Sequence, residues 1–212
     1  MVTVPRLEAR ITRSLLERIG SASNAEYVVT QAWSGGRPNE CFEAVEGRVA
    51  AEGGRALAGW ALWKGELLIE AEYYCVWVDE GGRKFDIAQR ELAFDRILFV
   101  PDDRSHGSGL QVNNLRLNLG SNPVVDYLIE AYDCVFLLEN AGERAKESSL
   151  SLDGMEAALH HYFTMLKGKL ELYAYRGASP DSPCFCGSRK PFHSCHQDDI
   201  CKAIAKVHAL VP

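Results

Sequence analysis

The chain has 212 residues, of which 47% are hydrophobic and 25% charged, as expected for one globular domain or one domain with a small appendage. Its net charge of −6 argues against a surface built as a whole to hold nucleic acid. The opening residues do not resemble a signal peptide, and we find no apolar run long enough to cross a bilayer, so we expect a cytoplasmic protein without a membrane span.

The first half of the chain predicts two helices followed by a sheet. Apolar residues at helical spacing predict a helix over 5–20, and a second helix is expected over 41–52 after a glycine- and proline-rich loop within 21–40. From residue 55 the periodicity changes to two, which is typical of strands joined by tight turns. The predicted strands are 55–63, 66–78, 83–88 and 96–100. We therefore expect an antiparallel β-meander.

Alternation along the second predicted strand separates two faces. One face is predicted to point to the core: Leu67, Ile69, Ala71, Tyr73, Cys75 and Trp77. The opposite face carries Glu70, Glu72 and Tyr74.

The second half predicts helices and a linker. Residues 101–121 are polar and glycine-rich, and we expect a long loop there with at most one short strand. Core helices are expected over 123–142 and 153–173, and a final helix over 198–210. The proline-containing stretch 176–183 is the predicted linker, which gives an α+β domain over 1–177 and a small module over 183–212. The predicted fold class is α+β, an antiparallel meander packed with helices and followed by this module.

The seven cysteines are the most informative part of the composition, because in a cytosolic protein metal binding or catalysis is a better explanation than disulfides. Cys184 and Cys186 precede a short loop, and Cys195 and His196 follow it. A Cys₃His set of this kind suits tetrahedral Zn²⁺ and leaves no open position for a catalytic water. The sequence therefore predicts a structural zinc site whose metal supplies folding free energy to a short segment.

Two other residues near this cluster are alternative ligands. His193 replaces His196 if the loop rearranges locally, whereas Cys201 lies about one helical turn too far along the chain and fits better as a small apolar residue of the final helix. The choice among these ligands stays open at this point.

The segment 184–196 resembles the SEC-C motif, the zinc knuckle at the carboxyl end of the SecA translocation ATPase, with the pattern C-x-C-x₈-C-[HC]. Gly187, Ser188, Lys190 and Phe192 also match the family pattern, whereas Arg189 stands where the family has a second glycine. The resemblance covers fifteen to twenty residues. It implies that the four ligands bind zinc and that the module docks a protein or a ribosome.

The charge of the tail fits such docking. Residues 176–212 carry five Lys/Arg against three Asp/Glu, whereas residues 1–175 carry 18 against 26. The predicted partner-binding residues are Arg189, Lys190 and Phe192. RNA binding through this basic tail is an alternative function.

A second alternative is a hydrolase or acyl transferase with Cys41 as nucleophile. A helix N-terminus stabilises a thiolate, and papain-like and transglutaminase-like enzymes place His and Asp on the strands that follow such a cysteine. Asp86 fits this order, but no histidine lies on a predicted strand, so His106 in the loop is the candidate base. The pattern across 53–102 also resembles a domain of uncharacterised bacterial proteins in which a histidine is common where this chain has Tyr74.

Overall fold

The computed structural model describes residues 1–20, 24–102, 110–146 and 150–211. Its contacts divide the chain into two compact units. The first, here called the sheet unit, comprises the described residues of Met1–Gly65, Ile69–Ser108 and Asn114–Leu117. The second, the helical unit, comprises those of Glu66–Leu68, Gly109–Asn113 and Asn118–Pro212. The α+β class predicted from the sequence is confirmed.

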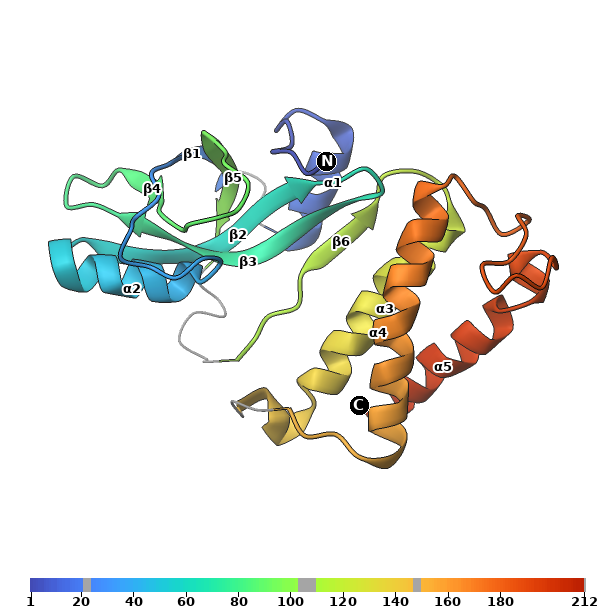
Figure 1. The fold of residues 1–212 in the computed structure, drawn as a ribbon. Helices are drawn as coiled ribbons and strands as arrows, with labels where there is room; N and C mark the ends of the chain where they lie inside the picture. The colour runs from blue at the N-terminus through green and yellow to red at the C-terminus, as the bar shows by residue number, and fades with distance from the viewer. Residues whose placement is uncertain (21–23, 103–109, 147–149, 212) are drawn as a thin grey trace. The chain divides into compact units, whose positions relative to one another are not determined.

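The sheet unit is built on a small, closed sheet (Figure 1). Its described strands are β1 (Glu26–Thr30), β2 (Arg55–Lys64), β3 (Leu68–Val78), β4 (Lys84–Asp86), β5 (Arg96–Pro101) and β6 (Leu115–Asn118). They are ordered β2-β5-β1-β4-β3-β6, and β2 also pairs with β3 along its whole length. This extra pairing closes the first five of these strands into a barrel, and β6 extends the sheet beyond β3.

The predicted strands occur within a few residues of their expected places, but two features were not predicted. The strand β1 forms in residues to which no strand was assigned, and it lies between β5 and β4, parallel to β4. The predicted core face of β3 also needs correction. Tyr74 was placed on the exposed face, yet it is 3% exposed, because the residues from 74 to 78 are buried on both faces.

Two helices belong to the sheet unit. The first, α1 (Arg10–Ile19), starts later than expected and buries Leu15, Leu16 and Ile19. The second, α2 (Cys41–Glu52), begins at Cys41 as predicted and packs against β2 (Figure 1). Its buried side chains join the core formed by β2, β3 and β5.

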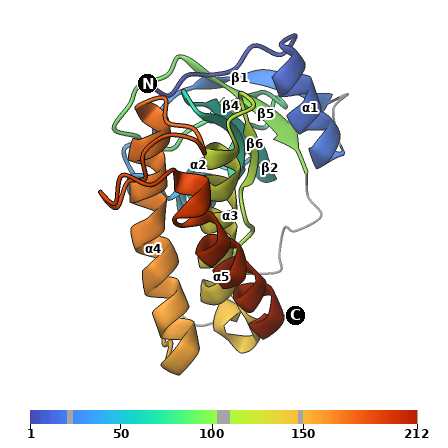
Figure 2. The same ribbon diagram turned by 90° about the vertical axis from the view of Figure 1, so that its right-hand side faces the viewer.

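The helical unit contains α3 (Pro123–Glu139), α4 (Gly154–Tyr175) and α5 (Gln197–Leu210), with short 3₁₀ helices at Gly142–Lys146 and Phe192–Ser194. The helices α3 and α4 lie side by side, and α5 packs on both (Figure 2). The Asn122 side chain caps α3 by accepting a hydrogen bond from the Val124 N–H at 3.1 Å.

The C-terminal segment shares one core with α3 and α4 rather than standing apart. Cys184, Phe192, Ile200 and Val207 are buried in that core. The separate folding of residues 183–212 stays a prediction, but the structure gives this segment apolar burial that the sequence did not reveal.

Gly59 lies where the closed sheet leaves no room for a side chain. A Cβ atom at this position would lie 2.1 Å from the Val100 carbonyl oxygen and 2.9 Å from the Pro101 Cα. We expect Gly59→Ala to lower the free energy of unfolding of the sheet unit by about 2 kcal/mol, because the backbone of β5 must move. Denaturant titration followed by tryptophan fluorescence measures this, since all four tryptophans of the chain lie in this unit.

Gly81→Ala is the matched control, because its Cβ atom would approach only the side chain of Asp79, at 3.3 Å. We expect a change of less than about 1 kcal/mol for this variant. Equal effects of the two substitutions would show that the close approach at Gly59 does not constrain the sheet.

Candidate functional site

The candidate metal site starts with a narrow backbone loop after α4. Pro183 and Pro191 form an antiparallel bridge, and the Cys184 N–H donates to the Lys190 carbonyl at 2.8 Å. Inside this loop the Gly187 N–H donates to the Cys184 carbonyl at 3.1 Å. These bonds turn the chain sharply, so that the first two cysteines lie on one side of the loop.

The turn requires a left-handed backbone at Arg189, where φ is 64°. A residue with a Cβ atom pays about 1–2 kcal/mol for this conformation, whereas glycine adopts it freely. A glycine would adopt this conformation without that cost, so Arg189 is a strained position of the loop.

The other two candidate ligands lie between the 3₁₀ helix and α5. The N–H groups of Cys195 and His196 both donate to the Phe192 carbonyl at 3.0 Å, and the His196 carbonyl accepts from the Ile200 N–H at 3.0 Å. Cys195 and His196 are thus held between the end of the 3₁₀ helix and the start of α5. This arrangement brings both side chains toward the loop.

The four side chains converge on one point. The Sγ atoms of Cys184, Cys186 and Cys195 and a ring nitrogen of His196 all lie within 4.8 Å of one another. The Sγ atoms of Cys186 and Cys195 are 3.6 Å apart, and His196 Nδ1 is 3.2 Å from the Cys184 sulfur. Tetrahedral Zn²⁺ places two sulfur ligands about 3.8 Å apart and a sulfur and a nitrogen about 3.6 Å apart. The donor set therefore fits a metal ion with modest adjustment.

The surroundings of the thiols differ. Hydrogen bonds from the Ser188 side chain and backbone lower the pKa of the exposed Cys186 thiol to about 7. Burial raises the pKa of the Cys184 thiol to about 11. A divalent cation between these groups would lower the pKa of each thiol, because its positive charge offsets the repulsion between neighbouring thiolates.

The alternative ligands lie outside this cluster. His193 is exposed, and its Nδ1 lies 3.1 Å from the Pro180 carbonyl oxygen and 3.2 Å from Asp181. Cys201 is also exposed, with its sulfur 3.9 Å from the Tyr127 hydroxyl. The structure thus brings His196, rather than His193 or Cys201, to the three cysteines.

Phe192 has a different place from the one predicted. It was expected to contact a partner, but its side chain is 0% exposed. Its ring packs against Tyr127, Tyr173 and Phe185 at centroid distances of 5.7–5.9 Å. This burial makes Phe192 a core residue and leaves Arg189 and Lys190 as the exposed predicted contacts.

Cys41 lies at the helix N-terminus as predicted, but its surroundings do not activate it. The side chain is 8% exposed, and burial raises the pKa of its thiol to about 12. The stabilising effect of the helix N-terminus on a thiolate is thus outweighed by the loss of hydration.

Cys41 interacts electrostatically with Tyr74, which in turn binds the predicted catalytic residue Asp86. Burial, and then the charge of Asp86, raise the pKa of Tyr74, whose hydroxyl donates to Asp86 Oδ1 at 2.8 Å. Asp86 is fully buried and also binds Arg90, with 2.6 Å between Arg90 Nη1 and Asp86 Oδ2. The Tyr74 hydroxyl thus donates its hydrogen bond to Asp86 and offers no acceptor nitrogen of the kind that a histidine would supply. His106 lies outside the described residues.

Arg90 was not identified from the sequence. It follows β4 in a stretch without regular periodicity, and the only available signal is its separation of four residues from Asp86. Such a spacing is informative on a helix, but here it occurs in an irregular segment.

Comparison of the chain with protein-family models, with curated proteins and with solved structures found no match. The resemblance of residues 184–196 to the SEC-C motif stays a prediction. Among the described residues, no helix is both long and apolar enough to cross a membrane.

The raised pKa of Cys41 leads to a prediction about its reactivity. At pH 7.5 its thiolate fraction is about a thousandfold smaller than that of a thiol with the reference pKa of 9.0. We expect iodoacetamide to modify Cys41 at least about a hundredfold more slowly than the exposed Cys201. Mass spectrometry of the peptides over time measures both rates in one sample. Preferential modification of Cys41 would contradict this picture and favour a nucleophilic cysteine.

Proposed function

We propose that the chain is a zinc-binding interaction protein, in which Cys184, Cys186, Cys195 and His196 hold Zn²⁺ and the ordered loop docks a partner. The observation that carries this proposal is the convergence of the four ligand atoms within 4.8 Å. Three thiolates and one imidazole favour Zn²⁺ over harder cations such as Mg²⁺ or Ca²⁺.

A structural role for the metal follows from the ligand count. Four protein ligands complete the tetrahedron, so no position is left for a reacting water. The metal would instead fix the loop of Cys184 and Cys186 to the start of α5. Its binding free energy would then add to the burial of Phe192 in the helical unit.

The charge on the exposed face of the loop favours a partner that carries negative charge. Zn²⁺ with three thiolates and a neutral imidazole carries about −1, and the exposed Arg189 and Lys190 carry two positive charges beside it. Such a face suits an acidic protein surface or the phosphates of ribosomal RNA. We propose the ribosome as the partner to be tested first.

The cysteine-enzyme alternative has less support. Cys41 is buried with a raised pKa, and the hydroxyl of Tyr74 donates its hydrogen bond to Asp86. Cys41 is therefore not activated as a nucleophile, and Tyr74 is not prepared to deprotonate it at neutral pH.

The proposal predicts one equivalent of zinc in the purified protein. The double variant Cys184→Ser and Cys195→Ser should lose this metal, because serine hydroxyls are poor zinc ligands. Elemental analysis by mass spectrometry, with the protein concentration taken from absorbance, measures the ratio. His196→Gln should lower zinc content, whereas His193→Gln should leave it unchanged.

Cys201→Ser is the matched control, since it removes a cysteine of the same segment that lies outside the cluster. Its zinc content should equal that of the unchanged protein. The proposal fails if the unchanged protein contains no stoichiometric zinc, or if the double variant keeps its metal.

Docking is tested separately by cosedimentation of the zinc-loaded protein with ribosomes. Replacement of Arg189 and Lys190 by serine should weaken binding and reduce the dependence of log affinity on log salt by about 2, one for each removed cation. The matched control replaces two exposed lysines of α5, Lys202 and Lys206, by serine.

Equal binding by the two double variants would contradict a docking role for the loop. No cosedimentation of the unchanged protein would exclude the ribosome as partner and leave the zinc result standing. The two parts of the proposal are thus tested independently.

A further inference from the structure

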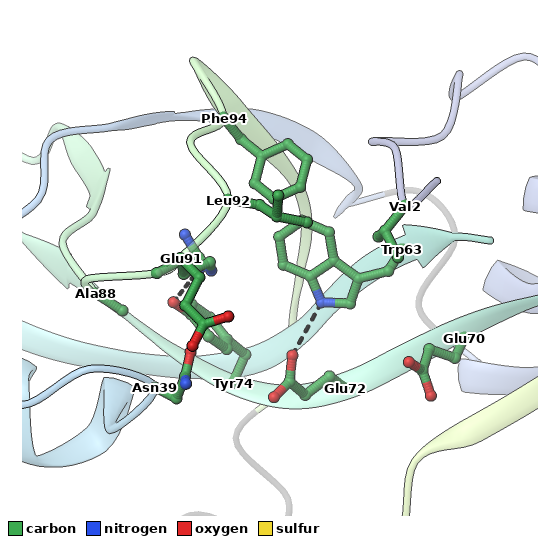
Figure 3. Close-up of a pocket in the computed structure, with 11 residues that line it drawn as sticks. Val2, Asn39, Trp63, Glu70, Glu72, Tyr74, Ala88, Glu91, Leu92 and Phe94 are labelled. Atoms are coloured by element: carbon green, nitrogen blue, oxygen red, sulfur yellow. Dashed lines mark hydrogen bonds between the residues drawn. The ribbon is translucent and has the colours of Figure 1, made fainter. Parts of the chain in front are cut away.

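The sheet unit contains a pocket of about 290 Å³ that none of the sequence motifs addresses. Figure 3 shows Trp63 standing over Glu72, with Phe94 beside the indole ring. Glu91 contributes a further carboxylate to the lining. The pocket thus combines aromatic walls with acidic groups, and its volume is that of a site for a small molecule.

Glu72 is the central polar group of this pocket. Its Oε2 atom accepts a hydrogen bond from the Trp63 indole N–H at 2.9 Å. Burial raises the pKa of its carboxyl group, so the ionised form lacks the solvation that it has in water. Within the described chain, no cationic side chain forms an ion pair with Glu72. The positive charge of Arg90 attracts it, but the guanidinium is held by Asp86 and Tyr74.

The other charges of the pocket leave an excess of negative charge. Glu70 is neutralised by Arg116, with Nε 3.1 Å from the carboxylate. Arg90 is neutralised by the buried Asp86. Glu91 is exposed and has no ion pair among the described residues, which leaves it and Glu72 without a cation of their own.

The aromatic rings offer faces that suit a cation. Trp63 and Phe94 pack with their centroids 5.1 Å apart. The guanidinium carbon of Arg90 already lies 5.1 Å from the centroid of Trp63 and 5.1 Å from that of Tyr74. An aromatic wall beside a partly desolvated carboxylate is the combination that recognises organic cations, because the ring quadrupole and the carboxylate attract the same charge.

We propose that this pocket binds a small organic cation, a protonated primary amine, with Glu72 as its charged acceptor and Trp63 and Phe94 as its apolar walls. The ammonium group replaces the missing counter-charge of Glu72. The alkyl chain packs against the rings and Leu92, which also lines the pocket.

The indole N–H of Trp63 is a direct reporter of this binding, because it donates to Glu72. We propose a titration of the ¹⁵N-labelled full chain with n-butylammonium, followed by NMR of the indole N–H signals and with the Trp63 signal assigned by Trp63→Phe. The expected result is a saturable shift of this signal at millimolar amine. The Trp60 and Trp77 indoles bind Asp102 and the Gly53 carbonyl and should not move.

Two neutral or anionic analogues and two variants separate charge recognition from apolar packing. Neither n-butanol nor butyrate should give a saturable shift. Glu72→Gln keeps an acceptor for the indole but removes the charge, and we expect it to weaken amine binding about tenfold or more. Phe94→Leu removes one aromatic wall and should also weaken it. Glu80→Gln, an exposed carboxylate outside the pocket, should have no effect.

A further titration with Nα-acetyl-lysine methylamide tests whether the bound ammonium group comes from a lysine side chain of a protein or from a small free amine. Tighter binding of the lysine derivative would identify a protein source, and tighter binding of butylammonium a small molecule. The inference is overturned if butylammonium gives no saturable shift, if n-butanol binds equally well, or if both Glu72→Gln and Phe94→Leu bind the amine as the unchanged protein does.

Discussion

The buried carboxylate of Asp86 is the constraint around which the sheet unit is arranged. A buried charge is tolerated only when charged and hydrogen-bonding groups compensate it. Here the Thr30 hydroxyl of β1 donates to it at 2.9 Å, Tyr74 of β3 donates at 2.8 Å, and Arg90 supplies the opposite charge. One side chain of β4 thereby fixes the two neighbouring strands and the guanidinium that forms part of the pocket lining. Because Arg90 forms its ion pair with Asp86, it attracts Glu72 without pairing with it, so the negative charge of the pocket follows from how the sheet is held.

The helical unit combines two sources of stability in a segment that is short. Phe192 is inserted between aromatic rings of α3 and α4, while the four candidate ligands lie on either side of it in the chain. Without a metal, packing of Phe192 holds three thiols close together with no cation between them. Without that packing, a metal would hold only a loop that is not attached to the helices. Because each contribution positions the residues that the other needs, metal binding and docking of the segment on α3 and α4 should be mutually reinforcing.

Local patterns were predicted well, and features that depend on distant parts of the chain were not. The main strands followed from alternation, and the ligand cluster followed from spacing within thirteen residues, since both are set by neighbours in sequence. The strand β1 was missed because five residues between loops carry little periodicity. Tyr74 was assigned to the wrong face because alternation separates two faces without showing that both are covered. Phe192 was taken for a surface residue because it lies between ligands, whereas its burial depends on Tyr127, far away in the chain.

The position of Phe185 has a consequence for how the helical unit would respond to its surroundings. Its ring contacts the His196 imidazole at 4.9 Å and the rings of Phe192 and Tyr173 at 5.9 and 5.8 Å. His196 thus belongs both to the candidate metal cluster and to a continuous row of rings that reaches into the core. An ion bound at His196 would therefore add its binding free energy to the stability of the helices that pack against these rings.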